Sequence, residues 1–272
     1  MSGSLHSESR LRFGFDSQRG ETVLRERRAG GLCHFGKPYR EGGLLALQIV
    51  NPTAGIFAGD HWRLAVELEK KARVRLSNPS ANRFHTMKGG SATLDQDIAV
   101  GAGGWLDFQP QWIIPQRGSA VTQTTRLQVA EGASLVYGEW LAPGRVAHGE
   151  EHRFRRLTTR LQLTVGERLV AREQMILEPA QGPWPLTVPD WEHCFYGAFW
   201  VVGAHDGEHL ARAVHGLPSE GLRAGYSELQ PGVGVVRLLA ARSLLLKGAS
   251  RAVRESLEPF FPLLAGGNRL IV

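Results

Sequence analysis

Two segments of the chain carry a spacing of histidines that is typical of a metal site. His148-Gly149-Glu150-Glu151-His152 and His205-Asp206-Gly207-Glu208-His209 both match H-x-x-E-H, which one class of zinc peptidase uses. That chemistry needs a helix, and on a strand the two histidines would lie roughly 13 Å apart. Each segment contains a glycine, which disfavours a helix. We interpret both as exposed loops and keep a metal-dependent hydrolase, which would retain metal on dialysis, as an alternative.

Isolated acidic and imidazole groups stand at expected strand ends and turns: Asp60, His85, Glu139 and Glu173. Glu139 and Glu173 interrupt otherwise apolar stretches. A carboxylate in such a place either pairs with an arginine, such as Arg145 or Arg172, or lines a wet channel. Arg172 is a poor partner for Glu173 because adjacent strand residues face opposite ways. Both readings stay open at this point.

Other catalytic machinery is missing from the sequence. It contains no Gly-x-Ser-x-Gly elbow, no Walker A loop and no strand-linked Gly-x-Gly-x-x-Gly. The two cysteines, Cys33 and Cys194, are far apart, which argues against a disulfide framework and a thiolate metal cage. We therefore predict no catalytic residues, no enzyme activity and no tightly bound cofactor.

Length and composition favour a soluble globular protein. The 272 residues are 42% hydrophobic, and we expect one domain over residues 1–272, with residues 1–10 disordered. No apolar run is long enough to span a membrane and no leader is evident, so we expect a cytoplasmic protein. The net charge is +6, but Lys and Arg are scattered, which favours an acidic protein surface over nucleic acid as a partner.

A short sequence pattern recurs three times, at residues 68–76, 100–108 and 129–137. Each copy reads as strand, tight turn and strand, with small residues at 72, 104 and 133. Spacings of 32 and 29 are typical of stacked supersecondary units. The sequence therefore predicts a mainly β fold, either a stacked sheet or a β-helix-like domain, with two short α-helices toward the C-terminus.

The remaining expected elements follow from alternation, apolar runs and turn residues. Strands are expected on both sides of a turn at 16–20, at 44–50, 160–165, 169–177 and 235–239, helices at 207–215 and 249–264, and loops at 51–60 and 179–189.

Six short segments, in order along the chain, are similar to motifs of the urease accessory protein family UreD, also called UreH. They are Asn51-Pro52-Thr53-Ala54-Gly55 with Gly59-Asp60, Asn78 to His85, Trp105 to Gln111, Glu139 with Gly144-Arg145, Gly149-Glu150, and Arg172-Glu173. The order and spacing hold from about Phe13 to the expected C-terminal helix. The chain departs from the family at Asn51, where the family has His, at Gln109, where it has Leu, and at the C-terminal segment 268–272.

The resemblance implies a non-catalytic scaffold. Members of this family assemble with a helical accessory protein (UreF-like) and a nickel-carrying GTPase (UreG-like), and they assist nickel insertion into apo-urease. They are also associated with a water-filled tunnel. Asp60, Glu139 and Glu173 match acidic positions near that route, and His85 stands where the family has an aromatic hydroxyl. The resemblance thus implies nickel in transit at these four residues.

Nickel chemistry agrees with this role. Nickel stands near the top of the divalent affinity order, so clustered Cys or His would trap it, whereas isolated carboxylates and water exchange it. We further expect the C-terminal helix region, with Arg254, Phe260 and Phe261, to dock the helical accessory protein. The alternative is a β-repeat module for protein–protein interaction with no metal role, which would fail to bind a urease partner.

Overall fold

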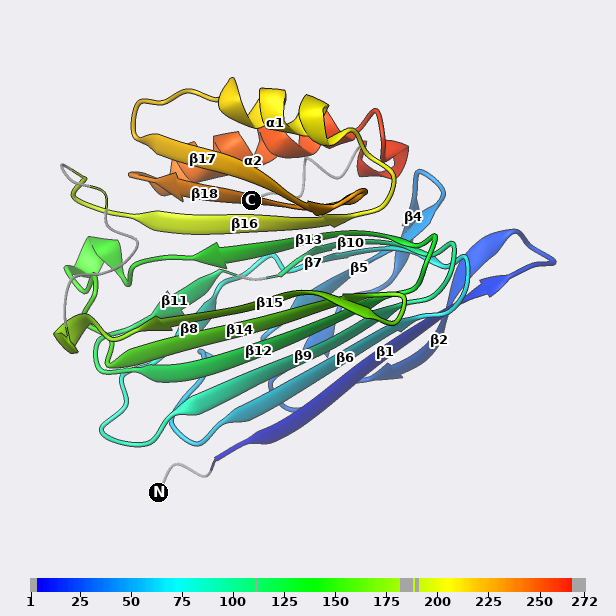
Figure 1. The fold of residues 1–272 in the computed structure, drawn as a ribbon. Coiled ribbons are helices and arrows are strands. Elements are labelled where there is room, and N and C mark those ends of the chain that lie inside the picture. Colours follow the sequence, from blue (N-terminus) through cyan, green and yellow to red (C-terminus); the bar gives the residue numbers. More distant parts are fainter. Residues whose placement is uncertain (1–3, 111, 182–187, 189–190, 266–272) are drawn as a thin grey trace.

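Two β-sheets are stacked face to face, and two helices cover the outer face of the second sheet (Figure 1). The computed structural model describes residues 4–110, 112–181, 188 and 191–265. The seven-stranded sheet has the order β15 (Arg168–Leu177), β14 (Arg156–Val165), β12 (Ala120–Val129), β9 (Ala92–Val100), β6 (His61–Leu68), β1 (His6–Asp16) and β2 (Glu21–Arg28).

The eleven-stranded sheet lies between the first sheet and the helices. Its main path is β17 (Leu222–Gln230), β18 (Val233–Ala240), β16 (Phe195–Val202), β13 (Ser134–Leu141), β10 (Trp105–Gln109), β7 (Arg73–Ser77), β5 (Leu44–Val50) and β3 (His34–Phe35). The short strands β4 (Tyr39–Glu41), β8 (Asn82–Phe84) and β11 (Ile113–Pro115) pair beside it. The helices are α1 (Gly207–His215) and α2 (Ser243–Leu257), and neither they nor any other described helix is long and apolar enough to cross a membrane.

The three sequence repeats form three stacked coils, which confirms the predicted fold class. Each coil places one strand in each sheet, and neighbouring coils pair in parallel. In the seven-stranded sheet β9 pairs with β6 and with β12, and in the eleven-stranded sheet β10 pairs with β7 and with β13. In each turn the amide of the small residue donates to the carbonyl three residues earlier, as from Ala72 to Glu69, Gly104 to Gly101, and Ala133 to Ala130. A bulky side chain would not fit because Ala72 and Ala133 are buried.

Side chains of the eleven-stranded sheet alternate between two cores. Along β13, Leu135 and Tyr137 face the core between the sheets, whereas Val136 and Trp140 face the core under the helices. Burial on both faces explains why β13 and β5 read as nearly continuous apolar runs rather than alternating ones. Any polar side chain on these strands is therefore placed in one core or the other.

Two predicted boundaries are wrong. Residues 6–10, expected to be disordered, form the first half of β1, which pairs in parallel with β6. The second helix spans Ser243–Leu257 instead of 249–264. Its start was missed because Leu244 to Leu246 reads as an apolar strand end, although Leu244 is exposed and Leu246 is buried, as on an amphipathic helix. It ends before Pro259, which has no amide N–H to continue the helical hydrogen bonds, although Glu258 keeps helical dihedral angles.

The other expected elements agree with the structure at their cores. The strands at 44–50, 160–165, 169–177 and 235–239 and the helix at 207–215 are all present. In the loop expected at 179–189, Pro179–Gln181 forms a short 3-10 helix, while residues 182–187 and 189 lie outside the described part of the chain, as does the departing segment 268–272.

Candidate functional site

Glu139 is a carboxylate in the core between the two sheets. It lies on β13, and its Oε2 accepts a hydrogen bond from Nε1 of Trp200, on the neighbouring strand β16, at 3.2 Å. No cationic side chain of the described residues lies within ion-pair distance of Glu139. Burial raises the pKa of Glu139 to about 7, because the hydrogen bond from Trp200 offsets only part of the desolvation.

Two small cavities meet at Glu139. One, of about 20 Å³, is lined by polar amides, and we call it the amide cavity; its amides are Asn78, Asn82, Gln96 and Gln123. The other, of about 30 Å³, is the carboxylate cavity, lined by Glu139, Glu173, Thr159 and Tyr196 among others. Glu139, Trp140 and Ile113 line both cavities. Each cavity exceeds the roughly 10–15 Å³ that one water needs.

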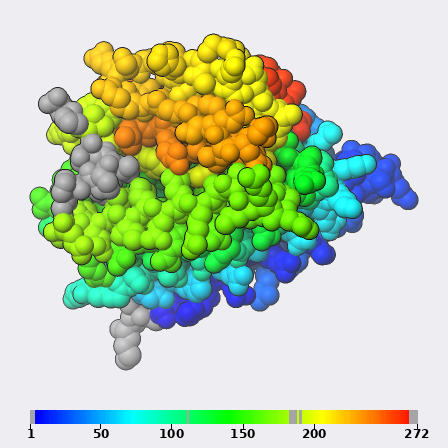
Figure 2. All heavy atoms as spheres, viewed as in Figure 1, coloured from blue at the N-terminus to red at the C-terminus, as the bar shows by residue number. Residues whose placement is uncertain are grey.

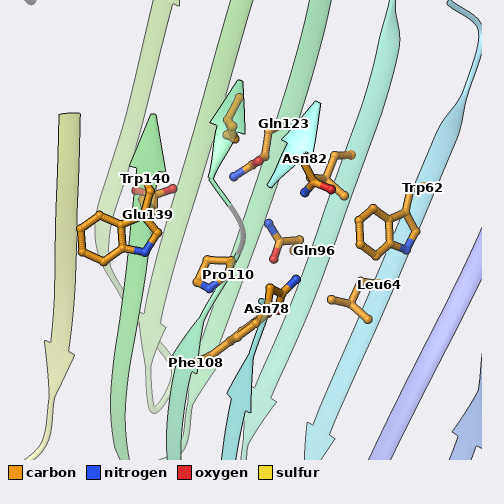
Figure 3. Close-up of a pocket in the computed structure, with 12 residues that line it drawn as sticks. Trp62, Leu64, Asn78, Asn82, Gln96, Phe108, Pro110, Gln123, Glu139 and Trp140 are labelled. Atoms are coloured by element: carbon orange, nitrogen blue, oxygen red, sulfur yellow. The ribbon is translucent and has the colours of Figure 1, made fainter. Parts of the chain in front are cut away.

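The amides of the amide cavity converge between Glu139 and Trp62 (Figure 3). The side chains of Asn82, Gln96 and Gln123 are almost fully buried. Oδ1 of Asn78, Oδ1 of Asn82 and Nε1 of Trp62 lack a hydrogen-bond partner among the groups that the structure describes. An unsatisfied buried polar atom costs about 1–3 kcal/mol, so these atoms favour water or another polar guest in the cavity.

Sequence reasoning missed these amides, although part of the signal was present. Gln96 and Gln123 occupy inward positions of β9 and β12, where the burial alternation calls for apolar side chains. A glutamine at such a position is the same kind of exception as a glutamate in an apolar strand. Their meeting in space depends on the register between coils, which the sequence alone does not give.

Glu173 lies at the other side of the carboxylate cavity and is paired. Nη2 of Arg237, on β18, donates to Oε1 and Oε2 of Glu173 at 3.0 Å each. The two readings of the sequence are therefore both realised, since Glu173 pairs with an arginine and Glu139 borders cavities. The partner is Arg237 and not Arg172 or Arg145.

Arg145 has another partner, which joins two motifs noted in the sequence. Its Nε and Nη2 donate to Glu150 Oε2 and Oε1 at 2.8 and 2.6 Å. The hydrogen bonds from Arg145 lower the pKa of Glu150 to about 2. Gly144 is required beside this pair because a Cβ there would lie 2.4 Å from the carbonyl oxygen of Glu150. The pair closes the loop that follows β13.

Asp60 and His85 do not line either cavity. The Asp60 carboxylate accepts hydrogen bonds from the amides of Leu5 at 2.9 Å and Phe57 at 2.8 Å. The His85 ring stacks on Phe57, with centroids 4.5 Å apart, and its Nε2 lies 2.9 Å from the carbonyl oxygen of Ala54. Of the four sequence-predicted residues, the structure therefore brings Glu139 and Glu173 together, whereas Asp60 and His85 order the loop at 51–60.

Two of the three residues expected to contact a partner are buried in the chain itself. Arg254 is fully buried and donates two hydrogen bonds to Asp107, at 2.8 and 2.7 Å. Phe261 is buried in the core under the helices, and Phe260 is half-buried with its ring 5.3 Å from that of His209. Arg254 and Phe261 thus offer no surface for direct contact in this conformation.

Neither H-x-x-E-H segment has the geometry of a zinc peptidase. His148 ends a short 3-10 helix, and His152 follows it with φ of +53°, so the two do not share a helix. His205 precedes Asp206, the N-cap of α1, so only His209 lies on that helix. His205 instead faces the hydroxyl of Tyr226 at 3.1 Å. The expectation that both segments are exposed loops holds only in part, because residues 207–209 belong to α1 and His152, His205 and His209 are half-buried.

Comparison with known proteins gives a consistent result. The family model described as UreD urease accessory protein matches residues 7–266. A protein named urease accessory protein UreD from Opitutus terrae is 33% identical over 247 residues, covering 89% of this chain and 91% of that protein. Proteins of the same name from Cupriavidus necator and Halalkalibacterium halodurans are 35% and 26% identical, covering 79% and 92% of this chain and 75% and 94% of their own length.

Proposed function

Because the chain belongs to the UreD family of urease accessory proteins, we propose that it acts in urease maturation by assisting the transfer of nickel into apo-urease. In this proposal it is a non-catalytic cytoplasmic scaffold that works with a helical UreF-like accessory protein and a nickel-carrying UreG-like GTPase. Nickel is cargo in transit and not a resident cofactor.

One observation carries the transfer role: Glu139 is a partly buried carboxylate without a cationic partner among the described residues, and it stands where two water-sized cavities meet. A carboxylate of this kind attracts a divalent cation. A single carboxylate with neutral amide oxygens and water holds nickel more weakly than a set of Cys or His ligands would, so the ion is able to leave again.

The size of the cavities sets a condition on the transfer. Volumes of about 20 and 30 Å³ hold roughly one water each, so a fully hydrated ion does not fit in the conformation described. The passage must widen as the ion moves, or the ion must exchange waters for oxygens of Glu139, Asn78 and Asn82. Ile113, which lines both cavities and packs in the core between the sheets, is the side chain whose displacement would join them.

The test replaces the two carboxylates singly, as Glu139→Leu and Glu173→Leu, and measures urease activity and its nickel content after maturation. Glu67→Leu is the matched control because Glu67 is a partly exposed carboxylate on the outer face of the seven-stranded sheet. We expect the first two variants to lower both readouts and the control to leave them unchanged. Full activation by Glu139→Leu, with the accessory complex still assembled, would contradict the transfer role and favour an interaction module without a metal role.

We also propose that the helical layer docks the helical accessory protein. Because Arg254 and Phe261 are buried, they do not contact a partner directly. We therefore place the contacts on the exposed side of α2, where Leu244 is 76% exposed. Leu244→Asp should abolish co-purification with the helical partner without unfolding the chain. Leu169→Asp, at a 54% exposed leucine of β15 in the other sheet, is the control and should co-purify normally. Normal co-purification of both variants would contradict docking at α2.

A further inference from the structure

Arg237 pairs across the two sheets with Glu173, one of the residues that line the carboxylate cavity. Glu173 lies on β15, the last strand of the seven-stranded sheet, whereas Arg237 lies on β18 of the eleven-stranded sheet. Their side chains are 34% and 42% exposed, so the ion pair stands between the interior and the solvent. On the face shown in Figure 2, the lime-green region of β15 adjoins the orange region of β17 and β18.

We propose that Arg237 is a counter-ion gate, which neutralises Glu173 until a divalent cation replaces the guanidinium and which restores the pair when the cation leaves. This inference rests on the nickel-transfer role proposed above. In this inference Arg237 prevents Glu139 and Glu173 from binding nickel too tightly for its release.

Two carboxylates with no counter-ion at one cavity would hold a divalent cation too firmly for a transfer route. Glu139 and Glu173 both line the carboxylate cavity, so their negative charges lie close together. A dication would be attracted by both charges, and the attraction is strong where solvent screens it poorly. Because Nη2 of Arg237 donates to both oxygens of Glu173, the incoming cation must displace a charged hydrogen-bond donor, so its binding is weakened and its release is assisted.

Arg237 has other contacts that can retain it when Glu173 is released. Its guanidinium carbon lies 5.9 Å from the centre of the Trp200 ring, within the range of a cation–π interaction. It also interacts electrostatically with Tyr196, which lines the carboxylate cavity. The guanidinium can therefore leave the carboxylate without losing every favourable contact, as a reversible gate requires.

Trp200 connects the gate to the inner carboxylate. Its ring contacts Arg237, and its indole N–H donates to Glu139. The side chain that can retain Arg237 is thus also the hydrogen-bond partner of Glu139.

The experiment measures binding of nickel(II) alone to the full chain in its complex with the helical accessory protein, by equilibrium dialysis. Arg237→Gln should bind nickel at least about tenfold more tightly than the wild type, and its complex should deliver nickel to apo-urease more slowly. Arg237→Lys should stay near the wild type because it keeps the charge. Adding Glu173→Gln to Arg237→Gln should cancel the gain.

A purely structural role for Arg237 gives a different pattern. Arg237→Gln would then lower the unfolding midpoint while nickel affinity stayed the same, which would overturn the gate. Failure of the gate is separable from failure of the transfer role. If Glu139→Leu impairs urease activation while Arg237→Gln leaves nickel affinity unchanged, only the gate is wrong. If Glu139→Leu activates urease normally, the transfer role and the gate that rests on it are both wrong.

Discussion

Each of the two faces of the eleven-stranded sheet carries a carboxylate, but the surroundings of the two carboxylates differ. On the face under the helices, Asp107 is fully buried and bound by Arg254 and Arg75, with oxygen–nitrogen distances of 2.7–3.1 Å. On the face between the sheets, Glu139 is partly buried, accepts one hydrogen bond from the residues that the structure describes, that of Trp200, and borders two cavities. The same sheet thus contains one closed ion cluster and one open polar site.

The difference also appears in the pKa values. Burial alone would raise the pKa of Asp107, but the charges of Arg254 and Arg75 outweigh it, so the pKa lies below its ordinary value. The pKa of Glu139 is raised to about 7 because no comparable charge compensates its burial. The ion pairs of Asp107 connect β7, β10 and α2, so they hold the helical layer on the sheet. Glu139 forms no such ion pair among the described residues, so its carboxylate is available to bind a water or a cation.

The largest effect is expected at the closed cluster. Asp107→Asn leaves Arg75 and Arg254 buried with less compensating charge, so the free energy of unfolding should fall by about 3–5 kcal/mol. Urea unfolding followed by circular dichroism measures this. Asp97→Asn, which removes a partly exposed carboxylate between Arg63 and Arg126, should cost about 1 kcal/mol or less. Equal losses in the two variants would contradict the distinction between the closed cluster and the surface pairs.

An intermediate effect is expected from the pH dependence of the open site. The pKa of Glu139 rises from 4.5 unfolded to about 7 folded, so its contribution is fully present below pH 4.5 and is lost as the pH rises to about 7. Relative to Glu139→Gln, the wild type should therefore lose at most about 3 kcal/mol over this window. The free energy of unfolding of both proteins is measured at matched pH values. In the difference between the two, the contributions of the other titrating groups cancel. A difference that stays flat from pH 4.5 to 7 would show that Glu139 is compensated.

The smallest effect on stability is expected in the amide cavity. Asn82→Leu removes the unpartnered Oδ1, so stability should stay the same or rise by about 1 kcal/mol, while nickel transfer to apo-urease should slow. Arg83→Gln, at the exposed neighbour on the same strand, should change neither. Thermal unfolding and the nickel content of matured urease measure the two readouts. A large loss of stability in Asn82→Leu would mean that the amide is a structural partner and not part of an open site.

The sequence could predict the coils because their signal is local. Small residues at 72, 104 and 133 end the same hydrogen-bonded turn, and the spacing between them sets the stacking. The start of α2 was missed because three leucines in a row fit a strand end as well as an amphipathic helix. Helix and strand are hard to separate in short apolar runs without the packing partner.

The site was predictable only in part. Glu139 and Glu173 were visible as carboxylates in apolar strands, and Arg237 carries the same signal, as one charge in the strand Val233–Ala240. That Arg237 meets Glu173 depends on how two separate sheets stack, which no local pattern encodes. The burial of Arg254 was hidden for the same reason, because its partner Asp107 is 147 residues away.

We propose above that the Glu139 carboxylate, which has no cationic partner among the described residues, binds nickel transiently on its way to urease. The most direct measurement is the rate at which nickel appears in apo-urease from a complex loaded beforehand at the nickel-carrying GTPase, with wild-type chain and with Glu139→Leu. The account predicts equal loading and assembly but a transfer rate at least about tenfold lower in the variant. An equal transfer rate in the assembled variant complex would contradict it.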